Sequence, residues 1–574
     1  MFLKQITSLF LLSLLILTAG TVQAQNASEF QVITHDDTLR SYRLYVPDTG
    51  ADRLVMVLHP FASNGRTMEV ITGFNALADE YGFAVVYPNS LGYYWDSGRS
   101  ANNLAPQDGP VDDIGFLSTL ADEVTTNLEI ETGNVYLTGM NNGGELAYLA
   151  ACTHPEQYQA VAVISTLMVS YQADECPETQ AEAINTLIVW GDRDHYFTGE
   201  NYEIETGRTI YSAQESLDFW TSRNACDIDN KQTPLANVEQ FNCDNDTSTT
   251  FVRVQGGGNV WYRTAGNQLN NVGVDASQLL AGFFTDSEAW LDEAQQPSII
   301  TTTPRSWLMY VPDSYIETEA TPIVLLLHGR TANGASQAYT SDFNAIAERE
   351  GFIAVYPDGL QQEWNYTRPP ESGPNDNLPD DEAFLGRLID DLALDLNIDA
   401  SRVYLTGYSN GGFMVQRMAC TMQDRFVGFA SVAATGAYGL PLVCLNRDTV
   451  PALYIHGTAD NIVPWEGITQ PSASGEPITV SASMSRTISF WADHNACGSD
   501  LDITDIPPTT DETQTRILTV TGCPDDAPVV VFMVVNGGHT WQGVRGNSDF
   551  LGFSSGDFNA SEVIWEFFTH FSLD

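Results

Sequence analysis

The sequence GYSNG at residues 407–411 fits the pattern G-x-S-x-G, which places a serine on a sharp turn between a strand and a helix. The apolar residues 403–406 before it have the pattern of a strand, and residues 413–419 after it have that of a helix. On such a turn the serine hydroxyl is exposed and can attack a carbonyl carbon. The sequence therefore predicts Ser409 as the nucleophile of an acyl-transfer reaction.

A serine nucleophile needs a base and a carboxylate that orients the base, and here the chain order is Ser, Asp, His. Asp460 lies in the segment HGTAD, just after the strand-like residues 452–455. His539 lies in NGGHTWQG, after the apolar run 529–535. We predict that Ser409, Asp460 and His539 form a catalytic triad.

Other residues compete for two of these roles. Asp448 is the alternative carboxylate, and Asp460 could instead cap a helix. The second half of the chain also contains four other histidines, His328, His456, His494 and His570. His456 falls on a strand pattern, as a core histidine would, and the last two fall on helical patterns near the surface. His539 is favoured because it follows a terminal strand and flexible glycines.

Backbone N–H groups must stabilise the oxyanion of such a reaction. We expect one donor from Asn410, which follows the nucleophile, and one from Arg330 in the loop LHGRT. The alternative for this loop is an ordinary turn with a core-facing His328. Three aromatic residues next to these positions could stack on an acyl group or a sugar, or could belong to the core: Tyr408, Trp465 and Trp541.

The first half of the chain repeats the second without its reactive groups. VYLTGMNNGG at 135–144 matches VYLTGYSNGG at 403–412, so Asn141 stands 268 residues before Ser409. Asn259 stands in the place of the histidine, whereas Asp194 is retained. His195 is a candidate replacement base, but it follows the carboxylate directly and cannot face it across a site. We expect one active copy and one degenerate copy.

Strand-like and helical segments alternate in each copy, which predicts an α/β fold with a doubly wound, mostly parallel sheet. In the second copy, residues 323–327, 352–356, 402–406, 428–433 and 452–456 have the pattern of buried strands, and 381–396 that of a helix. A repeat of this size is a whole domain. The expected organisation is a signal peptide (1–24), a degenerate α/β-hydrolase domain (25–293), a linker (294–303) and an active domain (304–574).

Residues 1–24 combine Lys4, an apolar run at 6–17 and the cleavage pattern VQA, which predicts a secreted or periplasmic protein. No later segment is apolar enough for a membrane anchor. The formal net charge is −50, which argues against nucleic acid and anionic membranes as partners. The acidic surface fits either solubility after export or a saline habitat. Eight cysteines without a C-x-x-C pair indicate disulfides, so we predict no metal site and no cofactor.

The second copy resembles the extracellular α/β-hydrolase esterases that include feruloyl esterases and polyhydroxybutyrate depolymerase-like proteins. The shared motifs are LHG, YPDG followed by Trp364, GYSNGG, HGTAD and GGHTW, and they extend over residues 298–574. The resemblance implies the same triad, and an ester-bearing polysaccharide or a polyester oligomer as the substrate. Two departures lie near the site: Arg330 follows LHG, without the cysteine-containing loop of some relatives, and Gln542 follows GGHTW.

The resemblance also suggests that Cys420 pairs with Cys444. We expect every pairing to stay within one copy, as Cys152–Cys176, Cys226–Cys243, Cys420–Cys444 and Cys497–Cys523.

The predicted function is a secreted serine carboxylic-ester hydrolase that releases feruloyl or acetyl groups from plant polysaccharide. The alternatives are hydrolysis of polyhydroxyalkanoate-type polyesters, and carbohydrate or polymer binding without turnover. The first copy is expected to be a scaffold or a binding module, and no oligomeric state is predicted.

Overall fold

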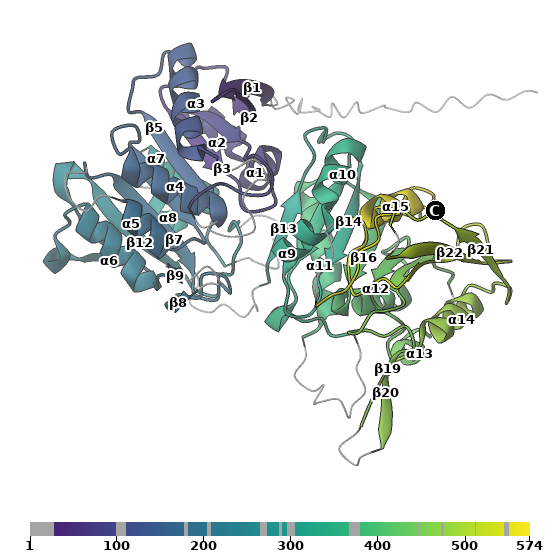
Figure 1. Cartoon of the computed structure of the whole chain (residues 1–574). Coiled ribbons are helices and arrows are strands. Elements are labelled where there is room, and N and C mark those ends of the chain that lie inside the picture. Colours follow the sequence, from purple (N-terminus) through teal and green to yellow (C-terminus); the bar gives the residue numbers. More distant parts are fainter. Residues whose placement is uncertain are drawn as a thin grey trace, which may run out of the picture.

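The computed structural model describes residues 28–573 except 99–110, 177–181, 204–207, 264–271, 286–289, 296–304, 367–378, 446–447, 472–475, 511 and 545–549. The predicted signal peptide and most of the predicted linker lie outside the described residues. Figure 1 shows two bodies, each built on its own sheet, in the order of the two sequence copies. We call them the first and the second domain.

Among the described residues, the sheet of the first domain has ten strands in the order β1-β2-β4-β3-β5-β6-β7-β12-β11-β10. They are β1 (Glu29–His35), β2 (Thr38–Tyr45), β3 (Leu54–Leu58), β4 (Ala84–Pro88), β5 (Val135–Met140), β6 (Ala160–Ile164), β7 (Asn185–Gly191), β10 (Gln232–Leu235), β11 (Val238–Asn242) and β12 (Ser248–Val254). The central six, from β4 to β12, are parallel, and the edges are antiparallel.

The second domain repeats this topology with nine strands among its described residues, in the order β13-β15-β14-β16-β17-β18-β23-β22-β21. They are β13 (Trp307–Tyr310), β14 (Thr321–Leu327), β15 (Ile353–Pro357), β16 (Ile398–Tyr408), β17 (Phe429–Val432), β18 (Ala452–Gly457), β21 (Leu501–Asp505), β22 (Gln514–Val520) and β23 (Val529–Val535). Short hairpins stand apart from the sheets: β8 (Tyr202–Glu203) with β9 (Thr209–Ile210), and β19 (Ile468–Pro471) with β20 (Pro477–Ser481). The five strands and the helix expected in this copy are all present.

Helices cover both faces of each sheet, because the parallel strands are apolar on both sides. In the first domain one face packs against α3 (Asp113–Leu128), α4 (Asn142–Thr153), α5 (Ser170–Glu175) and α6 (Ala213–Arg223). The other packs against α1 (Gly65–Thr72), α2 (Phe74–Tyr81), α7 (Ala276–Phe284) and α8 (Trp290–Glu293).

The second domain has the same two layers of helices. One layer contains α11 (Asp381–Asp395), α12 (Asn410–Thr421), α13 (Leu440–Val443) and α14 (Met484–His494). The other contains α9 (Gly334–Ser341), α10 (Phe343–Glu350) and α15 (Ala560–Phe568). The structure is therefore the α/β fold that the sequence predicts, present twice. None of the described helices combines the length and the apolar character needed to cross a bilayer.

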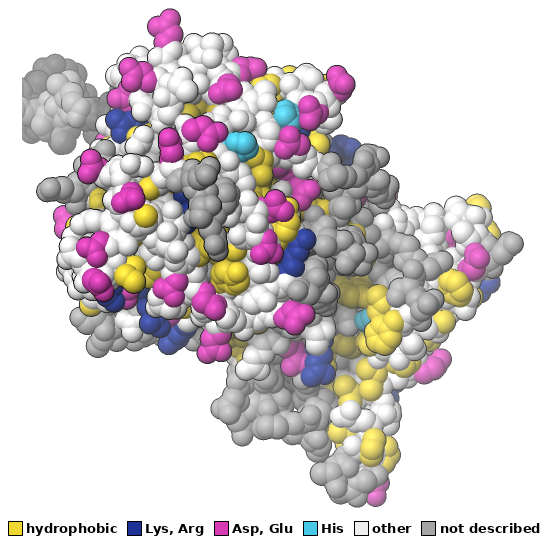
Figure 2. Space-filling view, turned by 60° about the vertical axis from the view of Figure 1, so that its left-hand side comes forward, with side chains coloured by type: hydrophobic (Ala, Val, Ile, Leu, Met, Phe, Trp, Pro, Cys, Tyr) yellow, Lys and Arg dark blue, Asp and Glu magenta, His cyan; other side chains and the backbone are white. Residues whose placement is uncertain are grey.

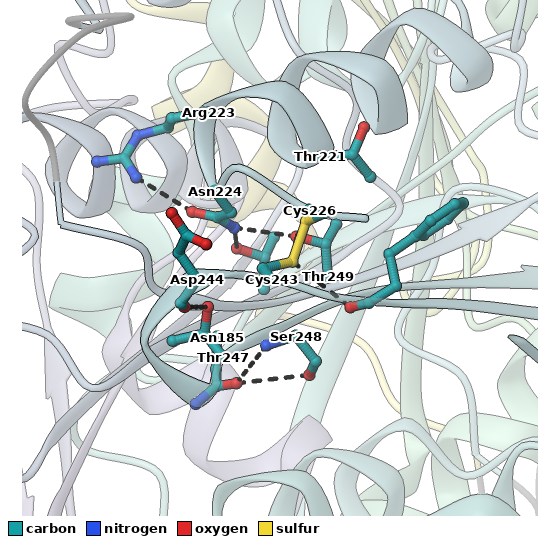
Figure 3. Close-up of a disulfide and its surroundings, with 12 residues drawn as sticks. Asn185, Thr221, Arg223, Asn224, Cys226, Cys243, Asp244, Thr247, Ser248 and Thr249 are labelled. Atoms are coloured by element: carbon teal, nitrogen blue, oxygen red, sulfur yellow. Dashed lines mark hydrogen bonds between the residues drawn. A yellow bond between two sulfur atoms is a disulfide. The ribbon is translucent and has the colours of Figure 1, made fainter. Parts of the chain in front are cut away.

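Four disulfides join the same cysteine pairs that the sequence analysis predicts. Figure 3 shows Cys226–Cys243, which links the chain after α6 to the chain after β11. Beside it, Asn224 donates to the hydroxyl of Thr249 on β12 at 2.9 Å. Such a bridge contributes about 2–4 kcal/mol by restricting the unfolded chain. It thus fixes a helix end to the outer strands of the sheet.

Candidate active site

Ser409 lies on the sharp turn between β16 and α12. Its backbone has φ 52° and ψ −113°, a strained conformation for a residue with a side chain. The turn is possible because glycines flank it: a Cβ at Gly411 would lie 2.2 Å from the carbonyl oxygen of Leu327 on β14. The serine itself is only half-buried. The strain therefore lies at the residue that the sequence predicts as the nucleophile.

The predicted base and carboxylate meet at the carboxyl edge of the same sheet. The Nδ1 of His539 lies 2.7 Å from the Oδ2 of Asp460, and both side chains are buried. The other carboxylate oxygen accepts the backbone N–H groups of Ile462 and Val463 at 2.9 and 2.8 Å. These bonds hold the carboxylate in place, so that Nδ1 of the imidazole carries the proton and Nε2 is left to act as the base.

Tyr408 connects this pair to the nucleophile next to it. Its ring centroid lies 5.0 Å from that of His539, and its hydroxyl donates to the His539 carbonyl oxygen at 2.5 Å. Ser409 and His539, both described, form no direct hydrogen bond in this structure. Catalytic hydrogen bonds of unliganded enzymes are often long and tighten when substrate binds. The structure thus brings the predicted residues to one edge of the sheet, with the Asp–His bond formed.

The competing residues are occupied elsewhere. His456 donates from Nε2 to the Val463 carbonyl oxygen at 2.9 Å, and its burial lowers its pKa to about 4. His494 pairs instead with the backbone carbonyl of Asp448 at 2.9 Å. His570 lies exposed beyond α15, where its Nδ1 bonds the carbonyl of Glu566. They do not replace the predicted triad.

His328 has a structural role in the loop that should form the oxyanion hole. Its Nδ1 donates to the carbonyl oxygen of Gly329 at 2.7 Å, and its Nε2 accepts the N–H of Gly359 at 2.9 Å. The alternative of a core-facing histidine is therefore right for the side chain. Its loop nevertheless reaches the nucleophile, because a Cβ at Gly329 would lie 3.5 Å from that of Ser409.

The two predicted oxyanion donors are Arg330 in this loop and Asn410 at the start of α12. Asn410 begins α12, where the first N–H groups of a helix have no intrahelical partner. Its side chain is held by the N–H of Trp364 at 2.6 Å. Arg330 has a largely exposed side chain that pairs with Glu363 at 2.7 Å, so only its backbone can face the reaction. Both assignments stay predictions.

The three candidate stacking residues separate into two groups. Trp541 is only 2% exposed, and its Nε1 donates to the hydroxyl of Ser561 at 2.8 Å. Trp541 belongs to the core, and its prediction as a substrate-binding residue is wrong. A ring that the protein buries cannot stack on a ligand. Tyr408 and Trp465 are half-buried and stay candidates.

In the first domain the counterparts of the triad form a chain of side chains with no reactive group. Asn141 donates to Asn259 at 3.2 Å, and Asn259 donates to Asp194 at 2.8 Å. Burial raises the pKa of Asp194 to about 6. The Asn141 backbone keeps the strained turn, with φ 54° and ψ −125°. We call these three residues the vestigial site.

The vestigial site also blocks its own oxyanion position. The side-chain oxygen of Asn141 accepts the backbone N–H of Asn142 at 2.8 Å, and Asn142 is the counterpart of Asn410. Asn141 is buried, in contrast to the half-buried Ser409. No sequence pattern indicates this plug, because it depends on the rotamer of one amide.

The second domain packs against the loop after β3, which is the counterpart of the predicted oxyanion loop. Ser63 donates to the carbonyl of Met309 on the edge strand β13 at 3.1 Å. Asn64 donates to the carbonyl of Val311, just after this strand, at 3.0 Å. One cavity between the domains measures about 480 Å³ and is lined by Arg193 and His195 on one side and by Ser306 and Asp358 on the other. A second cavity, beside Met140, measures about 70 Å³. Its lining includes Pro60, Met140, Val260 and Trp261 of the first domain and Trp307, Leu308 and Met309 of the second.

His195 does not act as a replacement base in the first domain. Its Nε2 lies 3.5 Å from the carboxylate of Asp358 in the second domain, and its Nδ1 lies 3.4 Å from the hydroxyl of Ser306. Burial opposes the charge on this imidazole, but the hydrogen bond to Asp358 and the charge of Asp358 outweigh it and raise the pKa of His195. Asp358 precedes Gly359, which bonds His328, so the contact reaches the oxyanion loop.

Comparisons with known proteins agree with the duplicated site. The family model described as esterase PHB depolymerase matches residues 40–176 and 305–439. The chain is 30% identical over 236 residues to the putative esterase NocK of Nocardia uniformis subsp. tsuyamanensis, a match that covers 39% of this chain and 67% of that protein.

Two further relatives match shorter stretches. Feruloyl esterase B of Piromyces equi is 26% identical, over 34% of this chain and 36% of that protein. Poly(3-hydroxyalkanoate) depolymerase C of Paucimonas lemoignei is 33% identical, over 22% of this chain and 30% of that protein. The chain thus spans about a third of the length of these two relatives. With a matching segment in each half, the chain belongs to the esterase PHB depolymerase family.

Proposed function

We propose that this chain is a secreted serine carboxylic-ester hydrolase and that turnover takes place at Ser409 of the second domain. The observation that carries the proposal is the contrast between two copies of one site. The second copy has a half-buried serine on the strained turn and a His539–Asp460 bond of 2.7 Å at the same edge. The first copy has amides in both reactive places. Export is supported by the predicted signal peptide and by the disulfides.

In the proposed reaction the Ser409 hydroxyl attacks the ester carbonyl while His539 takes its proton. Asp460 stabilises the imidazolium that forms, and the backbone N–H groups of Asn410 and Arg330 bind the oxyanion. His539 then returns the proton to the leaving alcohol, and the acyl group stays on the serine. Water activated by the same histidine releases the acid in the second half of the reaction.

We favour feruloyl or acetyl esters of plant polysaccharide as substrates. Tyr408 and Trp465 are the half-buried aromatic side chains that could stack on an acyl ring or on a sugar. The name of the relative from Piromyces equi, feruloyl esterase B, supports this choice. The name of the Paucimonas lemoignei relative supports the alternative, a polyester of hydroxyalkanoates.

The second domain exposes apolar side chains, one of them close in sequence to Asp460, and these suit either kind of acyl group. Ile462 follows the triad carboxylate by two residues and is exposed, as are Tyr438 and Leu442. Tyr438 is bonded to Val480 of the β19–β20 hairpin, which stands out from the second domain in Figure 1. Figure 2 shows acidic side chains spread over the visible face, with Lys and Arg between them. An uncharged substrate avoids repulsion from this surface.

For the first domain we propose a scaffold function. The side chain of Asn141 occupies the N–H of Asn142, and the three vestigial side chains are hydrogen-bonded to one another. A polymer-binding role for this site, or for the whole chain without turnover, is disfavoured by the plug and by the intact second site.

The test is hydrolysis by the chain that lacks residues 1–24. A panel of 4-nitrophenyl acetate, methyl ferulate, acetylated xylan and hydroxybutyrate oligomers separates the proposed substrate classes. The control variant is Asn141→Ala, because Asn141 stands in the first domain at the place that Ser409 has in the second. If all four esters are left intact by folded protein, the hydrolase proposal is wrong and the binding alternative stands.

A further inference from the structure

Three side chains that could bind a metal ion meet in the first domain, far along the chain from the catalytic residues. His35 ends β1, Asp36 lies in the turn between β1 and β2, and Asp112 precedes α3. One ring nitrogen of His35 and one carboxylate oxygen of each aspartate lie within 4.8 Å of one another. The Nε2 of His35 is 3.5 Å from the carboxylate of Asp112 and 3.7 Å from that of Asp36.

The hydrogen bonds around His35 fix which of its nitrogens carries a proton. Thr119 donates its hydroxyl hydrogen to the carbonyl oxygen of Gly115 at 2.8 Å. A hydroxyl has one hydrogen, so the contact of 3.1 Å between Thr119 and Nδ1 of His35 requires the imidazole to donate. In the neutral imidazole the lone pair is therefore on Nε2. This atom is buried and has no hydrogen-bond partner in the part of the chain that the structure describes.

Three acceptor atoms thus face one another: the Nε2 lone pair and two carboxylates. A proton on Nε2, water on the exposed carboxylates or a cation between the three groups can balance this arrangement. An N–H···O bond to a carboxylate would be about 2.7–3.2 Å long, shorter than either separation. Two N or O ligands of a tetrahedral Zn²⁺ ion, each about 2.1 Å from the metal, lie about 3.4 Å apart. The observed 3.5 and 3.7 Å fit ligands around a cation better than a hydrogen-bonded pair.

We propose that His35, Asp36 and Asp112 bind a divalent transition-metal ion, with Zn²⁺ as the best fit. An imidazole with two carboxylates is a ligand set for Zn²⁺ rather than for Ca²⁺, which takes oxygen ligands. The bond from Nδ1 to Thr119 orients the ring, as outer partners of metal-binding histidines do. The exposed carboxylates leave the remaining coordination positions to water. The net charge of −50 raises the local concentration of cations.

Such an ion would join the β1–β2 turn at the edge of the sheet to the start of α3. The site departs from the absence of metal predicted from the sequence, where no ligand spacing connects residue 35 with residue 112. The second domain provides an internal comparison: Asp380 caps α11 as Asp112 caps α3. The sequence has no histidine between His195 and His328, so the second copy cannot supply the imidazole.

The experiment titrates Zn²⁺ into the metal-free chain lacking residues 1–24, by calorimetry, with Co²⁺ absorption as a spectroscopic check. We expect one equivalent to bind in the micromolar range. His35→Ala should weaken binding at least tenfold, as should Asp112→Asn, which keeps a residue able to cap α3. Asp37→Asn, in the same turn, and Asp380→Asn are the matched controls and should bind as the parent does.

Circular dichroism shows whether each variant is folded, and ester hydrolysis should be unchanged in all of them, because the site lies outside the catalytic machinery. Absence of binding up to millimolar Zn²⁺ would overturn the proposal in favour of a protonated His35 paired with the two carboxylates. Equal weakening by Asp37→Asn and Asp36→Asn would also overturn it, since it would mean adsorption to an acidic turn. If folded His35→Ala binds Zn²⁺ as tightly as the parent chain, His35 is not a ligand and the proposed site is wrong.

Discussion

Restoring the two missing reactive groups should not restore catalysis to the first domain. The variant combines Asn141→Ser and Asn259→His in a Ser409→Ala background, so that any hydrolysis comes from the rebuilt site. The new serine would remove the plug on the N–H of Asn142, and Asp194 would be present to orient the histidine. Two structural obstacles are left.

The first obstacle is the oxyanion loop, where Pro60 stands in the place of Gly329. Proline restricts the loop that would have to present the N–H of Phe61, the counterpart of Arg330, and losing one oxyanion donor costs about 10²–10³ in rate. The second is access, because the second domain packs on the loop after β3 that carries Pro60. A substrate must compete with the bonds from Ser63 and Asn64 to the second domain. We expect the rebuilt site to reach at most about one-thousandth of the native rate.

The assay is hydrolysis of 4-nitrophenyl acetate by the purified chain, with Ser409→Ala alone as the background. Circular dichroism and the melting temperature establish that the variant is folded. A rate within tenfold of the native second domain would refute the reasoning. It would mean that substrate can enter the first pocket in solution and that this pocket kept its catalytic geometry. The proposed scaffold function of the first domain would then be wrong.

Three further predictions concern the second domain and the contact between domains. Ser409→Ala should lower kcat for ester hydrolysis by about 10³-fold or more with little change in melting temperature, because a lost nucleophile leaves only the oxyanion hole and binding; near-native kcat would refute this. Tyr408→Ala should raise KM for methyl ferulate more than for 4-nitrophenyl acetate if its half-buried ring contacts the acyl group, and equal changes would assign it to the core. Because the pKa of His195 is raised by Asp358, the contact between them stabilises the fold fully below about pH 6.5. This stabilisation is lost as the pH rises through the pKa of His195 in the folded protein. Melting curves should show this loss in the parent and not in His195→Gln; the same pH dependence in both would refute the contact.

The fold could be read from the sequence because each signal is local. A buried strand such as β14 is a continuous apolar run, and the turn at Ser409 is marked by its glycines. The order Ser409, Asp460, His539 was sufficient to choose the histidine that the structure places against the carboxylate. The constant offset between the two copies then identifies the counterparts of these residues in the first copy.

The rest depends on contacts between distant segments or on single rotamers. The plug by Asn141 is a side-chain orientation, and the bond from Ser63 to Met309 joins residues 246 positions apart. The sequence offers His195 only as a base of its own domain, because the packing of the two domains is what places it 3.5 Å from Asp358. Trp541 follows the predicted base His539 by two residues but points into the core, where its indole nitrogen donates to Ser561.

The most direct test of the account is covalent labelling with a fluorophosphonate, followed by peptide mass spectrometry. The account predicts one adduct per chain, on Ser409, with loss of hydrolysis in proportion to labelling and no adduct in Ser409→Ala. An adduct on any other residue that tracks the loss of hydrolysis, or hydrolysis that persists in fully labelled protein, would contradict the assignment of the active site to the second domain.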